Sequence, residues 1–73
     1  MVEGLLWFDS DPNRKLADKI DRAVQRYHHR LHSKPTICYV NIKDFDEQHP
    51  EINGILLKPK DNILPHHYLI GIE

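Results

Sequence analysis

Histidine is a metal-ligating side chain at neutral pH, and it is unevenly distributed along this chain. Six of the 73 residues are histidines, and five of them form two groups, His28-His29 with His32, and His66-His67. His28 and His32 are four residues apart and so share one face of a helix. A zinc site needs three or four converging ligands. The spacing therefore defines a candidate metal site of His28, His32, His66 and His67. The alternative is that the first group stabilises a helix C-terminus by its partial positive charge and the second begins a strand.

A second set of polar residues follows two apolar segments. Asp9-Ser10-Asp11 comes directly after Gly4-Leu5-Leu6-Trp7-Phe8, and Asn41 with Lys43 ends the apolar run that begins at Ile37. Ligands of α/β proteins bind beyond the carboxyl ends of the strands. We therefore expect a candidate pocket lined by Asp9, Ser10, Asp11, Asn41 and Lys43.

Catalytic signatures are otherwise lacking in the sequence. There is no Gly-x-Ser-x-Gly elbow and no phosphate-binding glycine loop, and the chain has three glycines in all. The single cysteine, Cys38, lies in the apolar run Ile37-Cys38-Tyr39-Val40, where a thiol is typical of an inert core residue. We assign no catalytic residue and expect no cofactor. The sequence favours a non-enzymatic protein.

Five basic residues form the most ordered pattern in the chain. They recur at offsets of four, three, four and four, which aligns them along one side of a helix over about 22 Å. We call this set the basic stripe, and its members are Lys15, Lys19, Arg22, Arg26 and Arg30. Long cationic side chains along a helix can follow the phosphates of a polyanion, and guanidinium groups suit bidentate phosphate contacts.

The charge around the stripe is segregated. Residues 12–34 carry seven Lys or Arg against two Asp, whereas the whole chain has a formal charge of −1, so the flanks are acidic. One alternative to polyanion binding is a solvated helix face, with Asp11 balancing Lys15 and Asp18 balancing Arg22 at the i, i+4 spacing. Another is an acidic protein partner, including a neighbouring subunit that presents its acidic segment 43–54.

The elements that must position these residues follow from periodicity and turn chemistry. We predict a strand at 4–8, an amphipathic helix at 12–32 capped by Asp11, a strand at 36–42, a loop at 43–54 with at most one helical turn, and strands at 55–58 and 67–72. The last two are expected to pair as a hairpin. The prediction is a small α+β single domain over residues 1–73, ordered β-α-β-β-β, with one long helix on a four-stranded mixed sheet.

One helix covers one face of such a sheet, yet the predicted strands are apolar on both sides. A second copy of the chain would cover the other face, because two-fold dimers are the commonest assemblies. The acidic segment 43–54 folding over that face is the alternative. No window is long and apolar enough to span a membrane, and a lone cysteine fits a reducing compartment, so we expect a cytoplasmic protein.

Three hypotheses of function follow. The leading one is a small non-enzymatic binding or regulatory module that acts as a homodimer through its sheet or helix surface. The second is a nucleic-acid-binding protein that uses the basic stripe. The third is a small metal-dependent hydrolase with His and Asp ligands.

Overall fold

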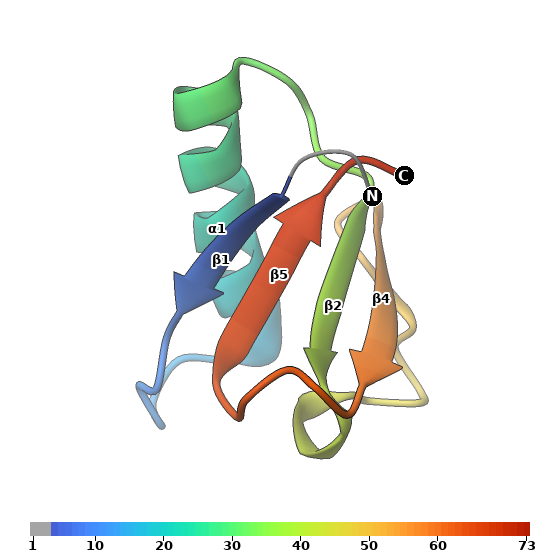
Figure 1. The fold of residues 1–73 in the computed structure, drawn as a ribbon. Coiled ribbons are helices and arrows are strands. Elements are labelled where there is room, and N and C mark those ends of the chain that lie inside the picture. The colour runs from blue at the N-terminus through green and yellow to red at the C-terminus, as the bar shows by residue number, and fades with distance from the viewer. Residues whose placement is uncertain (1–3) are drawn as a thin grey trace.

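The structure is a computed structural model that describes residues 4–73, and it has one α-helix packed on one face of a five-stranded mixed sheet (Figure 1). The predicted α+β class is confirmed. The elements in chain order are β1 (Gly4–Phe8), α1 (Leu16–Leu31), β2 (Ile37–Asn41), a 3-10 helix η1 (Ile42–Asp44), β3 (Glu51–Ile52), β4 (Ile55–Lys60) and β5 (His67–Gly71).

The fifth strand, β3, lies in the segment that was predicted to be loop. Asn53 and Gly54 both have positive φ, 53° and 80°, which is the backbone conformation of a two-residue hairpin turn. The turn pairs Ile52 with Ile55 and so adds β3 to the edge of β4. The prediction of four strands was therefore one short, because a two-residue strand has no periodicity of its own.

The helix begins four residues later than predicted. The Asp11 side chain accepts a hydrogen bond from the Asn13 backbone N–H at 2.9 Å, and the Arg14 N–H donates to the Asp11 carbonyl at 3.3 Å. Asp11 and Pro12 therefore form a turn, a role that both residue types favour, and Asp11 does not cap the helix. The N-cap is Lys15. The helix ends at Leu31, and the C-cap residue His32 has the left-handed conformation (φ 56°).

The strand order is β1-β5-β2-β4-β3, which corrects the expected hairpin between the last two long strands. β5 is antiparallel to both β1 and β2, and β4 is parallel to β2. The predicted β-α-β crossover is present and right-handed, with β5 inserted between its two parallel strands (Figure 1). β2 takes the central position because its apolar residues Ile37, Cys38 and Val40 are buried, as central strands require.

The core lies between α1 and the face of the sheet that the helix covers. Tyr27, Ile20 and Ala23 of the helix are buried against side chains from three strands, namely Cys38, Val40, Ile55, Leu57, Tyr68 and Ile70. Phe45 and Ile52 from the acidic segment pack on the same cluster. The acidic segment thus extends the helical layer, and it does not cover the opposite face of the sheet.

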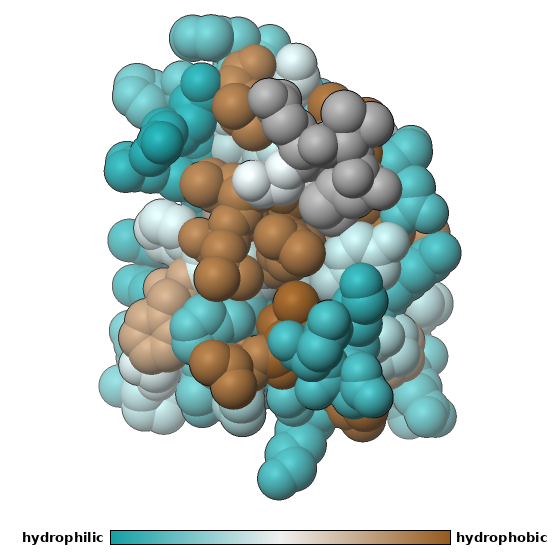
Figure 2. Space-filling model, in the orientation of Figure 1, coloured by the Kyte–Doolittle hydropathy of each residue, from teal (hydrophilic) through white to brown (hydrophobic). Residues whose placement is uncertain are grey.

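That opposite face, which we call the open face, is covered by no element within residues 4–73 (Figure 1). Figure 2 shows apolar side chains gathered over the middle of it. Leu6 and Phe8 are each 57% exposed and Leu56 is 42% exposed. No helix in the described part of the chain has the length and apolar character needed to cross a membrane.

The position of Cys38 leads to a prediction about its reactivity. Burial raises the pKa of this thiol from 9.0 to about 12, and the thiolate is the reactive form. We expect native protein at pH 8 to react with a disulfide reagent roughly a thousandfold more slowly than an exposed thiol does. The same protein in guanidinium chloride serves as the control and should react completely. Fast modification of the native protein would contradict the burial of Cys38.

Candidate functional site

The predicted pocket at the carboxyl ends of the strands is occupied by the chain itself. The loop that leads into β5 crosses this end of the sheet, where Asn41 Nδ2 donates to the Ile63 carbonyl at 2.7 Å. Asn41 Oδ1 accepts from the Lys43 backbone N–H at 2.8 Å, so the whole Asn41 amide serves the fold. On the other side of the loop, the His66 N–H donates to Asp44 at 2.8 Å and its carbonyl accepts from the Asp9 N–H at 3.0 Å.

Asp9 is the most buried charged group at this end, with 6% of its surface exposed. Arg14 Nη1 donates to Asp9 Oδ2 at 2.7 Å, and the Asp11 backbone N–H donates to Oδ1 at 3.1 Å. Burial acts to raise the pKa of Asp9, but the bonds from Arg14 and Asp11 outweigh it, and the net pKa lies below the usual 3.8. Asp9 therefore joins the end of β1 to the start of α1, a structural role. Ser10 is exposed beside it.

The basic stripe is shorter at the surface than its sequence spacing predicts. Lys15 lies just outside the helix, and Lys19 is only 8% exposed. Lys19 instead contributes to the positive potential at Asp9. Arg22, Arg26 and Arg30 are exposed and continue the stripe for about 12 Å along the helix.

The expected balance of the stripe by neighbouring aspartates is not formed. Within residues 4–73 no ion pair joins Asp18 to Arg22 or Asp11 to Lys15, and Asp11 lies 3.6 Å from Arg14 instead. The acidic segment of the same chain lies beside the N-terminal end of the stripe, where a hollow of about 640 Å³ is lined from the helix by Lys15 and from the segment by Asp46, His49 and Glu51.

The four histidines of the candidate metal site are not brought together. His28 and His32 are at the end of α1, and His66 and His67 are at the start of β5, at opposite ends of the molecule (Figure 1). No group of three or more His, Cys, Asp or Glu in the described part of the chain could hold a metal ion. His67 packs its ring against Phe8, with ring centroids 4.8 Å apart.

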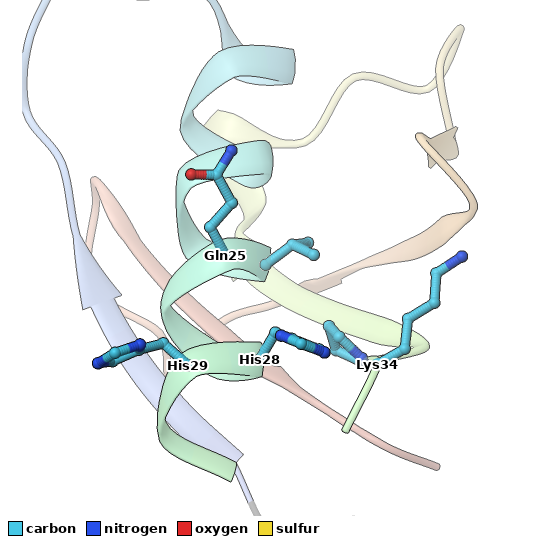
Figure 3. A pocket seen from close by; sticks show the side chains of 6 residues that line it. Gln25, His28, His29 and Lys34 are labelled. Atoms are coloured by element: carbon cyan, nitrogen blue, oxygen red, sulfur yellow. The ribbon is translucent and has the colours of Figure 1, made fainter. Parts of the chain in front are cut away.

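Two hollows flank the second half of α1. The first, of about 520 Å³, is lined by Val24, Gln25, His28, His29, Lys34 and Pro35. Figure 3 shows His28 pointing toward Lys34 across it, while His29 points to the other side of the helix, toward β1. The second hollow, of about 420 Å³, lies between the helix and β1 and is lined by Trp7, Arg22, Gln25, Arg26 and His29. We call the second one the arginine hollow.

The open face carries a polar border around its apolar centre. The Tyr39 hydroxyl donates to Glu73 at 2.6 Å, and this hydrogen bond raises the pKa of Tyr39 and lowers that of Glu73. The Lys60 ammonium lies 4.8 Å from the centroid of the Tyr39 ring. Leu6 and Leu69 lie opposite each other on this face, and Phe8 lies opposite His67, whose ring packs against it.

The sequence analysis missed two features of the structure, namely the place of Trp7 in the arginine hollow and the ion pair between Arg14 and Asp9. Trp7 was assigned to an apolar strand, and nothing in the spacing of residues 22–29 indicates that this strand lies beside them. Arg14 is outside the periodic stripe, although its distance of five residues from Asp9 across a turn was a signal for the ion pair. Comparison of the chain with protein-family models, curated proteins and solved structures finds no match.

The Asp9 corner generates a prediction about pH. Asp9→Asn should lower the urea midpoint at pH 7, because it removes the charge that Arg14 and the Asp11 N–H stabilise. The pKa of folded Asp9 is below 3.8, so this stabilisation is present above that pH and disappears as the pH falls through the folded-state pKa. The difference between variant and parent should therefore shrink below pH 3.8. Asp61→Asn, at an exposed carboxylate, is the control and should have little effect. A difference in urea midpoint between Asp9→Asn and the parent that stays constant down to pH 2 would show that the charge of Asp9 is not the source of the stabilisation.

Proposed function

We propose that this protein is a non-enzymatic binding module that acts as a homodimer, with β1 at the contact between the two copies. The observation that carries the proposal is the combination of a free, apolar strand edge with an apolar open face on the same strand. Leu6 and Phe8 belong to both surfaces. Cytoplasmic localisation is part of the proposal, and the free buried thiol of Cys38 favours it.

The hydrogen-bonding groups at the β1 edge support pairing with a second strand. The Asp9 N–H bonds to the directly opposite His66 carbonyl, so Asp9 belongs to a hydrogen-bonded pair. Such pairs alternate along an antiparallel ladder. The N–H and C=O groups of Trp7 and Leu5 therefore point toward β5, and those of Gly4, Leu6 and Phe8 point to the free edge.

The β1 edge lacks the features that keep single strands from pairing. Exposed edges are usually protected by short length, charged residues, proline or a bulge. The opposite edge of this sheet has these features, because β3 has two residues and the adjoining β4 ends Lys58-Pro59-Lys60. β1 has five residues, Gly-Leu-Leu-Trp-Phe, with no charge and no proline.

A two-fold axis at Leu6 makes this edge complementary to itself. Antiparallel pairing of two copies places Leu6 opposite Leu6 and Gly4 opposite Phe8 of the second copy. On the open face, the Phe8 ring then lies over the space that a glycine leaves, a cross-strand pair that stabilises sheets. The hydrogen-bonding groups of Leu6 match in the same register. Both the apolar side chains and the backbone groups of the edge are satisfied by a single arrangement.

We expect light scattering after gel filtration at micromolar concentration to give twice the chain mass of 8.7 kDa. Leu6→Lys should yield a monomer, because it places two ammonium groups face to face at the axis and protects the edge. Ile42→Lys is the matched control, since Ile42 is also 57% exposed but lies in η1, and it should remain dimeric.

The wild-type chain running as a monomer would overturn the proposal. So would dimers of both lysine variants. Far-ultraviolet circular dichroism of each variant checks that the fold is retained, which we expect because Leu6 contributes little to the core.

A further inference from the structure

The arginine hollow combines the groups that recognise a phosphodiester. Its walls are the guanidinium side chains of Arg22 and Arg26, with the Gln25 amide and the His29 ring beside them, and the β1 side is Trp7. The hollow has a volume of about 420 Å³ and is shallow and open to solvent, so it suits a ligand that lies along the surface. Arg30 belongs to the same stripe but does not line the hollow.

Arg22 and Arg26 form no ion pair with the part of the chain that the structure describes. Within residues 4–73, no carboxylate lies within 4.0 Å of the guanidinium of Arg22 or Arg26, whereas Arg14 contacts both Asp9 and Asp11. The nearby Asp21 instead accepts a hydrogen bond from Gln25 Nε2 at 3.0 Å. The hollow is therefore a region of positive electrostatic potential, and a bound anion could supply the negative charge that Arg22 and Arg26 lack.

Trp7 adds an aromatic surface and an unused donor. Its ring is partly buried against the core and partly lines the hollow. The indole Nε1 is buried and has no hydrogen-bond partner in the described part of the chain. Because the Nε1 atom is buried, the part of Trp7 that a ligand in the hollow can contact is the exposed part of its ring. An aromatic ring beside guanidinium groups is the pairing that stacks bases while the phosphates are held.

We propose that the arginine hollow binds the backbone of a nucleic acid, with Arg22 and Arg26 on phosphate oxygens and Trp7 against a sugar or base. Phosphate fits the two guanidiniums because each can donate two parallel hydrogen bonds to it. An acidic peptide would satisfy the charge but would make no use of the ring. This assignment does not depend on the dimer, because the hollow lies on the helix-covered side of β1 and is complete within one chain.

The single tryptophan makes the hollow directly observable, since Trp7 is the only one in the sequence. We expect a short oligothymidylate to change the Trp7 emission in a saturable way at low salt, with the same midpoint as the anisotropy of a labelled copy. The affinity should fall steeply as salt rises. A duplex of equal length shows whether paired strands also bind. Sodium polyglutamate at equal charge is the comparison, and it should leave Trp7 emission unchanged.

Charge reversal then separates the hollow from the general potential of the helix. Arg22→Glu with Arg26→Glu should weaken oligonucleotide binding about tenfold or more and reduce the salt slope. Arg30→Glu with Lys34→Glu changes the net charge equally on exposed neighbouring positions and should have a much smaller effect. Arg22→Ala with Arg26→Ala repeats the test without introducing acidic groups.

Several results would overturn the proposal. One is a Trp7 emission that changes with neither the oligothymidylate nor the duplex. Another is a response to polyglutamate equal to that to the oligonucleotide. A third is an equal loss of oligonucleotide affinity in the two charge-reversal pairs. The Leu6→Lys variant, which tests the dimer, should keep the Trp7 response, because Leu6 points to the open face. If the wild-type protein is a monomer and still binds the oligonucleotide, the homodimer proposal is wrong and the nucleic-acid proposal stands.

Discussion

A single helix can cover only one face of a sheet, and most of the surface chemistry of this protein follows from that limit. The helix and the acidic segment lie on the same side, where Tyr27, Phe45 and Ile52 complete one core. The other side is left with apolar side chains that no described element covers. Folding therefore produces a two-layer structure with one closed face and one open face, which is the setting for every interaction proposed above.

β1 has a central part in that setting, because its two faces and its free edge carry different chemistry. Its helix-covered face places Trp7 beside the arginines of α1, and its open face exposes Leu6 and Phe8. The alternation of side chains along a strand separates these functions. A ligand in the arginine hollow and a second copy at the edge would thus contact one five-residue strand without competing for the same side chains.

The charged groups divide between structural and outward-facing roles. The buried Asp9 and Lys19 and the partly exposed Arg14 form the junction between β1 and α1, and Asn41 and Asp44 hold the loop before β5. Asp9 and Asn41 were assigned to a candidate pocket because polar residues at strand ends are typical of ligand-binding sites. Here they satisfy backbone and side-chain hydrogen bonds of the fold. Arg22, Arg26 and Arg30, in the second half of α1, are exposed and form no ion pair within residues 4–73.

Much of the architecture was predictable from local patterns. The bounds of β1, the helical periodicity around Ile20 and Tyr27 and the apolar strand at Cys38 each depend on residues close in sequence. The prediction of a hairpin between β4 and β5 was wrong, because adjacency in sequence does not decide which strand occupies the centre of the sheet. That position goes to β2, whose side chains are apolar on both faces and gain most from burial on both.

The sequence by itself determined the class of fold, the amphipathic helix, the segregation of charge and the excess of apolar strand surface over helical cover. Each of these is a property of composition or of short-range periodicity. Only the tertiary structure decided that Lys19 is buried, that the two histidine groups lie at opposite ends, that a loop fills the predicted pocket and that Trp7 borders Arg22 and Arg26. The physical reason is that such neighbours are set by strand order and helix packing, which depend on burial summed over the whole chain.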